Sequence, residues 1–92
     1  MKYQILYHSD VKDDLAKIPR NIKDRICKAI ELRLMVDPLH YGDFLKKSLS
    51  GYCKMRVGDF RVIYRLKENN IIVVKIGHRK EVYKNVFSRI GF

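Results

Sequence analysis

The apolar residues of this 92-residue chain change their spacing once, near Pro38. Before Pro38 they recur every three or four positions, which is typical of one face of a helix. After it they tend to recur at every second position, which is typical of a strand. A chain of this length buries a smaller share of its surface than a larger domain does, so it has room for one modest core. We therefore expect a single domain, residues 1–92, of the α+β class, with helices packed in a second layer on a sheet.

The segment before Pro38 predicts one strand and two helices. Residues 2–7 are rich in β-forming residues and should form the first strand. A hairpin of two helices is expected within residues 9–36, with these apolar residues on the buried faces: Val11, Leu15 and Ile18 in the first helix, and Ile22, Ile26, Ala29, Ile30 and Leu34 in the second. The second helix should end near residue 36, because a proline disfavours helical geometry at the residue before it, here Asp37.

The segment after Pro38 predicts three strands of an antiparallel meander, over residues 52–57, 60–67 and 71–76. In the first strand, the alternation puts Cys53, Met55 and Val57 on one face and Tyr52, Lys54 and Arg56 on the other. In the second, Phe60, Val62, Tyr64 and Leu66 share one face, and Arg61, Ile63 and Arg65 share the other. Gly58 and Asp59 should make a tight turn between these two strands. The third strand is apolar throughout, which predicts a central strand covered on both faces.

Two further segments are less regular. Residues 39–50 predict a connection with some strand character, so that three or four strands follow the helices. Residues 81–92 carry Val82, Val86 and Ile90 at helical spacing and predict a short terminal helix. The expected order is therefore β-α-α-β(3–4), with an antiparallel sheet, the helix hairpin on one face and a short C-terminal helix.

Positive charge is concentrated in the second half of the chain. The whole chain has 20 Lys and Arg against 10 Asp and Glu, a net charge of +10. Residues 43–92 hold 12 basic and 4 acidic side chains, a net of +8, whereas residues 1–42 hold 8 and 6, a net of +2. So basic a segment attracts polyanions by releasing their counterions, and nucleic acid is the first partner to consider. The alternative is a soluble basic protein without a particular anionic partner.

Motifs of several other protein classes are missing. The sequence contains no HExxH, no phosphate-binding loop and no GxGxxG, and its histidines, His8, His40 and His78, are scattered. Cys27 and Cys53 stand in no metal-binding pattern, so we expect two reduced thiols in the core, with a disulfide or a zinc site as the alternatives. The sequence therefore predicts neither a metal nor a cofactor.

Membrane and export signals are also missing. No apolar run reaches the roughly 18 residues of a membrane span. The N-terminal residues turn polar and acidic too early for a secretory signal. We therefore expect a cytoplasmic protein that has no membrane partner.

Basic side chains should gather on one face of the predicted sheet. Lys54 and Arg56 are two residues apart on a strand and therefore point the same way. Arg61 follows in the next strand across the tight turn, where a hairpin brings facing residues to about 5 Å. Arg79 and Tyr83 come after the last strand. Like charges so close repel each other, so an anionic partner would account for the cluster. A solvated basic face is the alternative.

Two segments, GYCKMRVGDFRVIYRL and IGHRKEVYKNV, make the chain resemble toxins of the RelE/ParE superfamily. The resemblance covers nearly the whole chain, in length and in the order of strands and helices. An arginine and a tyrosine after the last strand, here Arg79 and Tyr83, are typical of the RelE-like branch. The resemblance thus implies a toxin of a type II toxin–antitoxin system, a metal-independent endoribonuclease (mRNA interferase) that cuts messenger RNA in the ribosome and inhibits translation. It also implies a cognate antitoxin protein, acidic and partly disordered when free.

Two other functions stay open at this point. A ParE-like toxin would poison DNA gyrase by binding it, without nuclease chemistry. A non-catalytic basic module would only bind RNA. The nature of the product distinguishes these alternatives: cut message, broken DNA, or intact nucleic acid that is bound in a salt-sensitive way.

The resemblance further implies a catalytic set. Its members fall on basic and aromatic residues of the second half of the chain: Lys54, Arg56, Arg61, Arg79 and Tyr83. The position of Arg56 often holds a second lysine in the family, and an arginine is a poor proton acceptor because it stays charged in proteins. Lys54 is therefore the expected general base, with His78 as an auxiliary alternative.

These residues suit a cleavage that uses the ribose 2′-OH of the RNA as the nucleophile. Lys54 would accept the proton of the 2′-OH as it attacks the adjacent phosphate. Arg61 and Arg79 would stabilise the charged phosphorane, and Tyr83 would stack on a base or orient the phosphate. The products would be a 2′,3′-cyclic phosphate and a 5′-hydroxyl.

Overall fold

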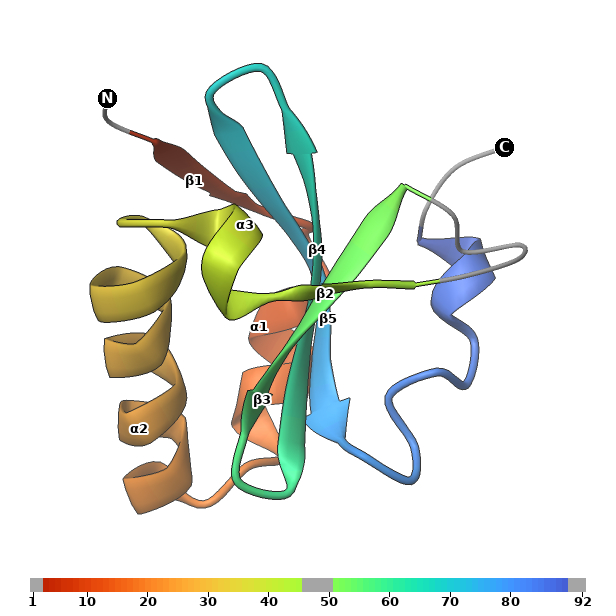
Figure 1. Ribbon diagram of the computed structural model, residues 1–92. Coiled ribbons are helices and arrows are strands. Elements are labelled where there is room, and N and C mark those ends of the chain that lie inside the picture. Colours follow the sequence, from red (N-terminus) through yellow and green to blue (C-terminus); the bar gives the residue numbers. More distant parts are fainter. Residues whose placement is uncertain (1–2, 46–50, 90–92) are drawn as a thin grey trace.

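A five-stranded sheet organises the part of the chain that the structure describes, residues 3–45 and 51–89. In this computed structural model the strands are β1 (Gln4–Tyr7), β2 (Asp43–Phe44), β3 (Tyr52–Val57), β4 (Phe60–Lys67) and β5 (Asn70–His78), in the spatial order β1-β5-β4-β3-β2. The helical elements are α1 (Val11–Ala16), α2 (Arg20–Ala29), a π-helical turn (Ile30–Leu34), α3 (Pro38–Tyr41) and a 3-10 turn (Val86–Ser88). Figure 1 shows α1 and α2 on one side of the sheet and residues 79–89, the terminal segment, on the other.

The predicted α+β class and the helix hairpin on one sheet face are confirmed. The sheet is mixed, however, whereas the sequence predicted an antiparallel one. β3, β4 and β5 form the expected antiparallel meander, but β1 pairs in parallel with the first half of β5. β1 and β5 can pair in parallel because the chain between them is long enough for the crossover that a parallel pair needs. The helices and the first strands of the meander together supply it.

The main core lies between the helices and the sheet and is built from the apolar faces that the sequence predicted. Its buried members are Val11, Ile18, Ile26, Ala29, Ile30 and Leu34 from the helical half, and Cys53, Met55, Val57, Val62, Tyr64, Ile71, Val73 and Ile76 from the sheet. Leu15, Ile22, Phe60 and Leu66 pack against this cluster. α1 ends at Ala16, so Ile18 reaches the core from the turn that follows the helix. None of the helices in the described part of the chain is long and apolar enough to cross a bilayer.

The end of the second helix follows from Pro38, as predicted. Helical geometry continues through the π-helical turn, and Asp37 is then extended, with φ −152° and ψ 80°. Pro38 takes the first position of α3, where its missing N–H costs nothing. The hydroxyl of Tyr64 donates a hydrogen bond of 2.6 Å to the carbonyl of Pro38, which ties α3 to the sheet. Gly42 is required at this contact, because a Cβ there would lie 1.7 Å from the Tyr64 hydroxyl oxygen.

The connection after α3 has the strand character that the sequence indicated, but it is short. β2 has two residues, which pair antiparallel with β3. Residues 46–50 of this connection, which include Leu49 and Ser50, lie outside the described residues.

A smaller apolar cluster covers the other face of the sheet. Its buried members are Tyr52, Ile63, Val74 and Val82, with Leu45 and Ile72 packed against them. β5 is thus covered on both faces, as its continuous apolar sequence predicted. Val82 belongs to the terminal segment and packs on β5, where a Cβ added to Gly77 would lie 3.5 Å from the Val82 Cα. The terminal segment therefore covers this second cluster.

The prediction of a terminal helix over residues 81–92 is wrong in extent. Turns follow β5, and within residues 79–89 only Val86–Ser88 is helical, as a single 3-10 turn. Asn85 has φ +58° and ψ 16°, a left-handed conformation that interrupts a right-handed helix. Val82 and Val86 are both buried, as their apolar character predicted. Ile90, the third residue of the predicted stripe, lies outside the described residues.

The two cysteines differ from each other. Cys53 is buried in the main core and is free, as expected. Cys27 is also free but exposed, so the prediction of two core thiols is wrong for this residue. The reason is its helical position, since Cys27 follows Ile26 and falls between the buried stripe positions of α2. Burial raises the pKa of the Cys53 thiol above its usual range.

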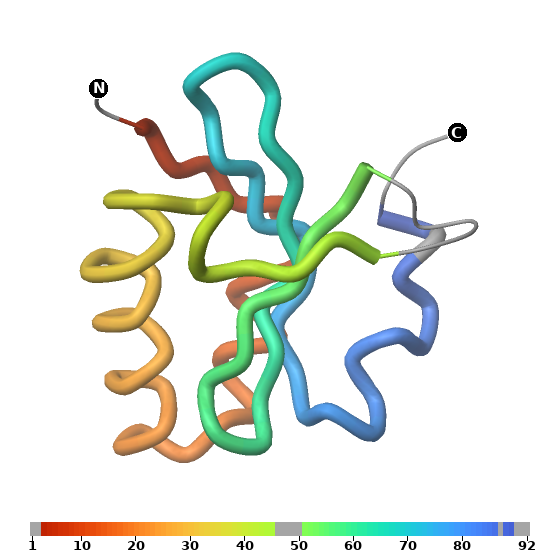
Figure 2. The backbone as a smooth tube through the Cα atoms, in the orientation of Figure 1, coloured from red at the N-terminus to blue at the C-terminus, as the bar shows by residue number. Residues whose placement is uncertain are grey.

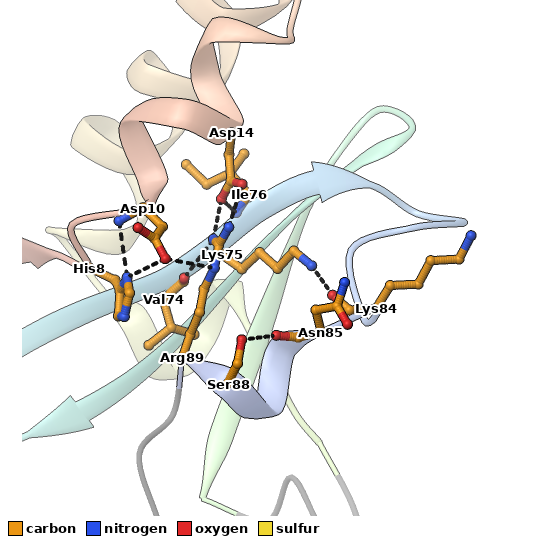
Figure 3. Close-up of polar contacts among 10 residues, drawn as sticks. All are labelled: His8, Asp10, Asp14, Val74, Lys75, Ile76, Lys84, Asn85, Ser88 and Arg89. Atoms are coloured by element: carbon orange, nitrogen blue, oxygen red, sulfur yellow. Dashed lines mark hydrogen bonds and ion pairs between the residues drawn. The ribbon is translucent and has the colours of Figure 1, made fainter.

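Asp14 and Arg89 close the part of β5 that β1 leaves unpaired. β1 covers β5 only as far as Val73. Beyond it, the N–H of Ile76 donates to a carboxylate oxygen of Asp14 (3.0 Å), and Arg89 donates to the carbonyl of Val74 (3.2 Å). Arg89 and Asp14 are joined by two hydrogen bonds of 2.6 and 2.9 Å (Figure 3). This contact, the Asp14–Arg89 clamp, holds the end of the terminal segment against α1 and β5, and the hydrogen-bonded carboxylate raises the pKa of Arg89.

Candidate functional site

The hairpin of β3 and β4 brings three of the predicted basic residues onto one face of the sheet. Arg56 lies directly opposite Arg61 in the ladder, as predicted, and Lys54 is two residues away on the same face. The residues that alternate with these three along the strands point to the helix-covered face. The three cations therefore lie on the face that also carries the second apolar cluster. Lys54 and Arg61 are partly buried and Arg56 is exposed.

Arg61 is held in place by the turn that precedes it. Its guanidinium donates two hydrogen bonds of 2.9 Å, to the carbonyls of Gly58 and Phe60. Gly58 has φ +59°, which a residue without a side chain adopts at little cost. An arginine has five N–H donors, so these two bonds leave others for an anion. The turn therefore orients the guanidinium without saturating it.

Arg79 is tied to the same turn. Its backbone N–H donates to the carbonyl of Asp59 (2.8 Å), and its side-chain Nε lies 3.7 Å from a carboxylate oxygen of Asp59. Figure 2 shows the β3–β4 turn and the start of the terminal segment side by side at the same end of the sheet. The turn of Gly58 and Asp59 thus contacts both Arg61 and Arg79, the two arginines that we expect to stabilise the phosphorane.

Tyr83 lies in the terminal segment, on the same side of the sheet as the basic residues. Arg61 faces Gly77 in the β4–β5 ladder, and Val82 packs on Gly77. Tyr83 is the next residue along the chain, and 37% of it is exposed. The packing of Val82 therefore places Tyr83 on this side of the sheet, as a partly exposed residue.

His78 is separated from this group. It pairs with Phe60 at the end of the β4–β5 ladder, and the two rings meet edge to face with centroids 5.6 Å apart. Phe60 belongs to the helix-covered face, so His78 points away from the face of Lys54 and Arg61. Its Nδ1 accepts a hydrogen bond of 3.2 Å from the N–H of Lys80. The structure thus does not bring His78 together with the other predicted residues.

Three residues of this region were not assigned to the site from the sequence. Arg65 continues the basic row along β4 and lies over the ring of Tyr52, 5.9 Å from its centroid. Asp43 faces Lys54 in the β2–β3 ladder and gives the lysine an acidic neighbour. Asp59 had been assigned only to the turn. The alternation of β4 had already placed Arg65 on the face of Arg61, but the position of Asp43 depends on a two-residue strand that carries no sequence period.

The arrangement suits the binding of phosphate groups and the movement of a proton. Guanidinium groups form paired hydrogen bonds with phosphate oxygens, and the lysine adds a group that can exchange protons. Within residues 3–45 and 51–89 no group of three or more His, Cys, Asp and Glu side chains lies close enough to hold a metal ion.

Comparison with known proteins identifies the class to which this fold and site belong. A family model described as the ParE toxin of the type II toxin–antitoxin system parDE matches residues 5–83. The chain therefore belongs to this family of toxins, and the predicted membership of the RelE/ParE superfamily is confirmed.

Individual relatives come from the RelE side of the superfamily. The chain is 26% identical over 86 residues to toxin RelG of Mycobacterium tuberculosis, which covers 91% of this chain and 99% of RelG. The solved toxin–antitoxin complex RelBE2 of M. tuberculosis contains a chain with a TM-score of 0.81 and 25% identity, which covers 86% of this chain and all of that one. The RelB–RelE complex of Methanococcus jannaschii contains one with a TM-score of 0.66 and 28% identity, covering 85% and 94%.

Proposed function

We propose that this toxin is a RelE-like, ribosome-dependent endonuclease that cuts messenger RNA and thereby inhibits translation. The observation that carries the proposal is the turn of Gly58 and Asp59, which contacts both Arg61 and Arg79 at the end of an exposed basic face. A pair of oriented guanidinium groups is what a pentacoordinate phosphate needs for stabilisation. The similarity to RelG supports the RelE branch.

The proposed reaction proceeds by attack of the ribose 2′-OH on the adjacent phosphorus. Lys54 accepts the proton of the 2′-OH, and the bond from phosphorus to the 5′-oxygen of the next nucleotide breaks. Arg61 and Arg79 stabilise the charge of the phosphorane, each contributing about 10²- to 10³-fold to the rate. The products are a 2′,3′-cyclic phosphate and, after the leaving oxygen takes up a proton, a 5′-hydroxyl.

Arg56 and Tyr83 have supporting roles in this proposal. Arg56 is exposed beside Arg61 and adds a charge for the phosphates that flank the cut. Tyr83 offers its accessible ring to a base, a contact that contributes about 1–3 kcal/mol. His78 faces the other side of the sheet and is assigned no part in the chemistry.

A cognate antitoxin is the proposed protein partner. The relatives from M. tuberculosis and M. jannaschii were solved as toxin–antitoxin complexes, which supports such a partner for this chain. The net charge of +8 in residues 43–92 favours a partner that is acidic, and a segment disordered when free can fold against it. We place this pair, with the ribosome and its message, in the cytoplasm.

The first test is the removal of each proposed phosphate ligand. We expect Arg61→Ala and Arg79→Ala to lose growth arrest and about 10²- to 10³-fold in message cleavage, because each variant lacks one donor to the phosphorane. The measurement is the mapping of message ends in cells that express each variant. Arg20→Ala, which removes an exposed arginine at the start of α2, is the matched control and should cut normally. Undiminished cutting by both site variants would refute the proposed site.

A ParE-like gyrase poison is the second candidate, because the matching family model is described as a ParE toxin. Such a toxin would act by binding, so double-strand breaks in DNA would accumulate while messages stay intact. A module that only binds RNA would leave both nucleic acids intact. One expression experiment that scores message ends and DNA breaks together separates these functions.

A further inference from the structure

A carboxylate stands among the arginines of the proposed phosphate site. Asp59 occupies the second position of the β3–β4 turn, and its carboxylate lies 3.7 Å from Nε of Arg79. The side chains of Asp59 and Arg79 are 73% and 55% exposed, so the pair is open to solvent and to a ligand. A negative charge at this position lowers the affinity of the site for phosphate unless it moves aside.

The carboxylate is not needed to build the turn. Gly58 supplies the positive φ, and the tie to Arg79 is made by the backbone carbonyl of Asp59, which any residue would provide. An ion pair as exposed as this one adds little to stability. The turn therefore does not depend on the Asp59 carboxylate, which can interact with groups of the phosphate site instead.

The two arginines are held by different kinds of partner. Arg61 is held by the carbonyls of Gly58 and Phe60, which are neutral and leave its charge uncompensated. Arg79 instead faces a full negative charge. A phosphate that approaches the site therefore meets Arg61 ready to bind, whereas it must compete with Asp59 for Arg79.

We propose that Asp59 is a positioning residue that acts through Arg79, as an internal anion that occupies the guanidinium in the free toxin and is displaced by an RNA phosphate. The inference rests on the proposed function for the identity of the ligand. Its consequence is selectivity. Stray polyanions must displace Asp59 to gain the Arg79 contact, and only a substrate held by further contacts does so readily.

The test is a double-mutant cycle on binding, with a ligand that cannot be cut. The probe is a fluorescent 2′-O-methyl oligoribonucleotide, whose blocked 2′-oxygen excludes the proposed reaction. Anisotropy titrations compare the wild type with Asp59→Asn, Arg79→Ala and the double variant over a range of salt concentrations. Asparagine is a favoured turn residue, so the fold should persist, and the midpoint of urea unfolding checks this.

We expect Asp59→Asn to bind the probe about 2- to 5-fold more tightly at low salt, the size of effect that an exposed ion pair has. The slope of log K against log salt should also steepen, because in the variant no displaced carboxylate takes up a cation when a phosphate binds Arg79. Both gains should vanish when Arg79 is alanine. Asp59→Glu, which keeps the charge, should bind like the wild type.

Glu68→Gln is the matched control, because it removes one exposed negative charge at the opposite end of β4. Its small gain in affinity should persist in the Arg79→Ala background. The inference is overturned if Asp59→Asn binds no more tightly than this control, if its gain survives without Arg79, or if no variant binds the probe. Cleavage of unmodified message on ribosomes is scored separately, with a lower KM and an unchanged kcat expected for Asp59→Asn. A toxin that binds by this cycle but never cuts would refute the nuclease proposal alone.

Discussion

At the scale of single residues, the proposed chemistry depends on which group takes the proton of the 2′-OH. Lys54 lies on the basic face, two positions from Arg56, with Asp43 opposite it in the neighbouring strand. Arg61 keeps its charge and cannot serve as the base. His78 lies on the other face, and its Nδ1 accepts a hydrogen bond from the backbone N–H of Lys80. Lys54 is therefore the proton acceptor that we propose for this site.

The substitution Lys54→Arg tests this assignment. It retains the positive charge and the capacity to bind phosphate, but it replaces an ammonium group that can release a proton by one that does not. We expect cleavage to fall about 10²- to 10⁴-fold, the usual contribution of a general base, while binding to ribosomes stays within about 2-fold. Single-turnover cleavage and ribosome co-sedimentation measure the two quantities. Lys12→Arg, an exposed change in α1, is the control, and wild-type cutting by Lys54→Arg would reduce Lys54 to an electrostatic contact.

At the scale of elements, the terminal segment carries Tyr83 of the proposed site and packs against the rest of the fold. It has little regular structure, yet Val82 and Val86 are buried and Arg89 is bonded to α1 and β5. Short segments of this kind are stable mainly through such packing. The Asp14–Arg89 clamp also satisfies backbone groups that β1 leaves unpaired, so it protects an open strand edge. Loss of the clamp should therefore affect both stability and the placement of Tyr83.

Asp14→Asn is predicted to destabilise the fold by about 1–3 kcal/mol, because hydrogen bonds to charged groups contribute roughly this much. The Arg89 side chain, only 14% exposed, would lose its nearest counter-charge and keep only the longer ion pair with Asp10, at 3.9 Å. Urea unfolding measures the change, and amide exchange at Ile76 should rise because its N–H donates to Asp14. Asp24→Asn removes an exposed carboxylate from α2 and should leave both readouts unchanged. Equal stability of the two variants would show that the clamp does not secure this edge.

At the scale of the whole molecule, the sheet divides the protein into two unlike sides. The helices lie on one side and the terminal segment on the other (Figure 1). The main core is buried under the helices, and the basic residues of β3 and β4 lie on the opposite face. An acidic antitoxin can inhibit the proposed cleavage in two ways. It can lie over the basic face, or it can displace the terminal segment and take Tyr83 with it.

Amide hydrogen exchange of free and antitoxin-bound toxin distinguishes these modes. Direct cover lowers exchange in residues 52–64, whereas displacement raises it in residues 82–89. Because the described part of the terminal segment has little regular structure, with one 3-10 turn at Val86–Ser88, we expect it to be the less protected of the two regions in the free toxin. If antitoxin binding left both regions unchanged, inhibition would have to act elsewhere, for example through the bulk of the complex at the ribosome.

The sequence was sufficient where a single period controls the structure. The helical stripes ending at Leu34 and the alternation of β3 and β4 follow from one amphipathic pattern each, and so does the pairing of Arg56 with Arg61. Features that join distant segments could not be predicted. The clamp links residues 75 positions apart, and the parallel pairing of β1 is decided by which sheet edge remains free. The contact of Asp59 with Arg79 likewise depends on how the chain leaves β5, where no period is present.

The central claim is that this toxin cuts RNA by means of the 2′-OH at the cut site. The most direct measurement uses purified ribosomes programmed with two messages, identical except for a 2′-deoxy sugar on the 5′ side of the mapped cut. We expect a 2′,3′-cyclic phosphate and a 5′-hydroxyl from the unmodified message and no cut at that position in the deoxy message. Equal cutting of both messages, or products that carry a 5′-phosphate, would contradict this claim.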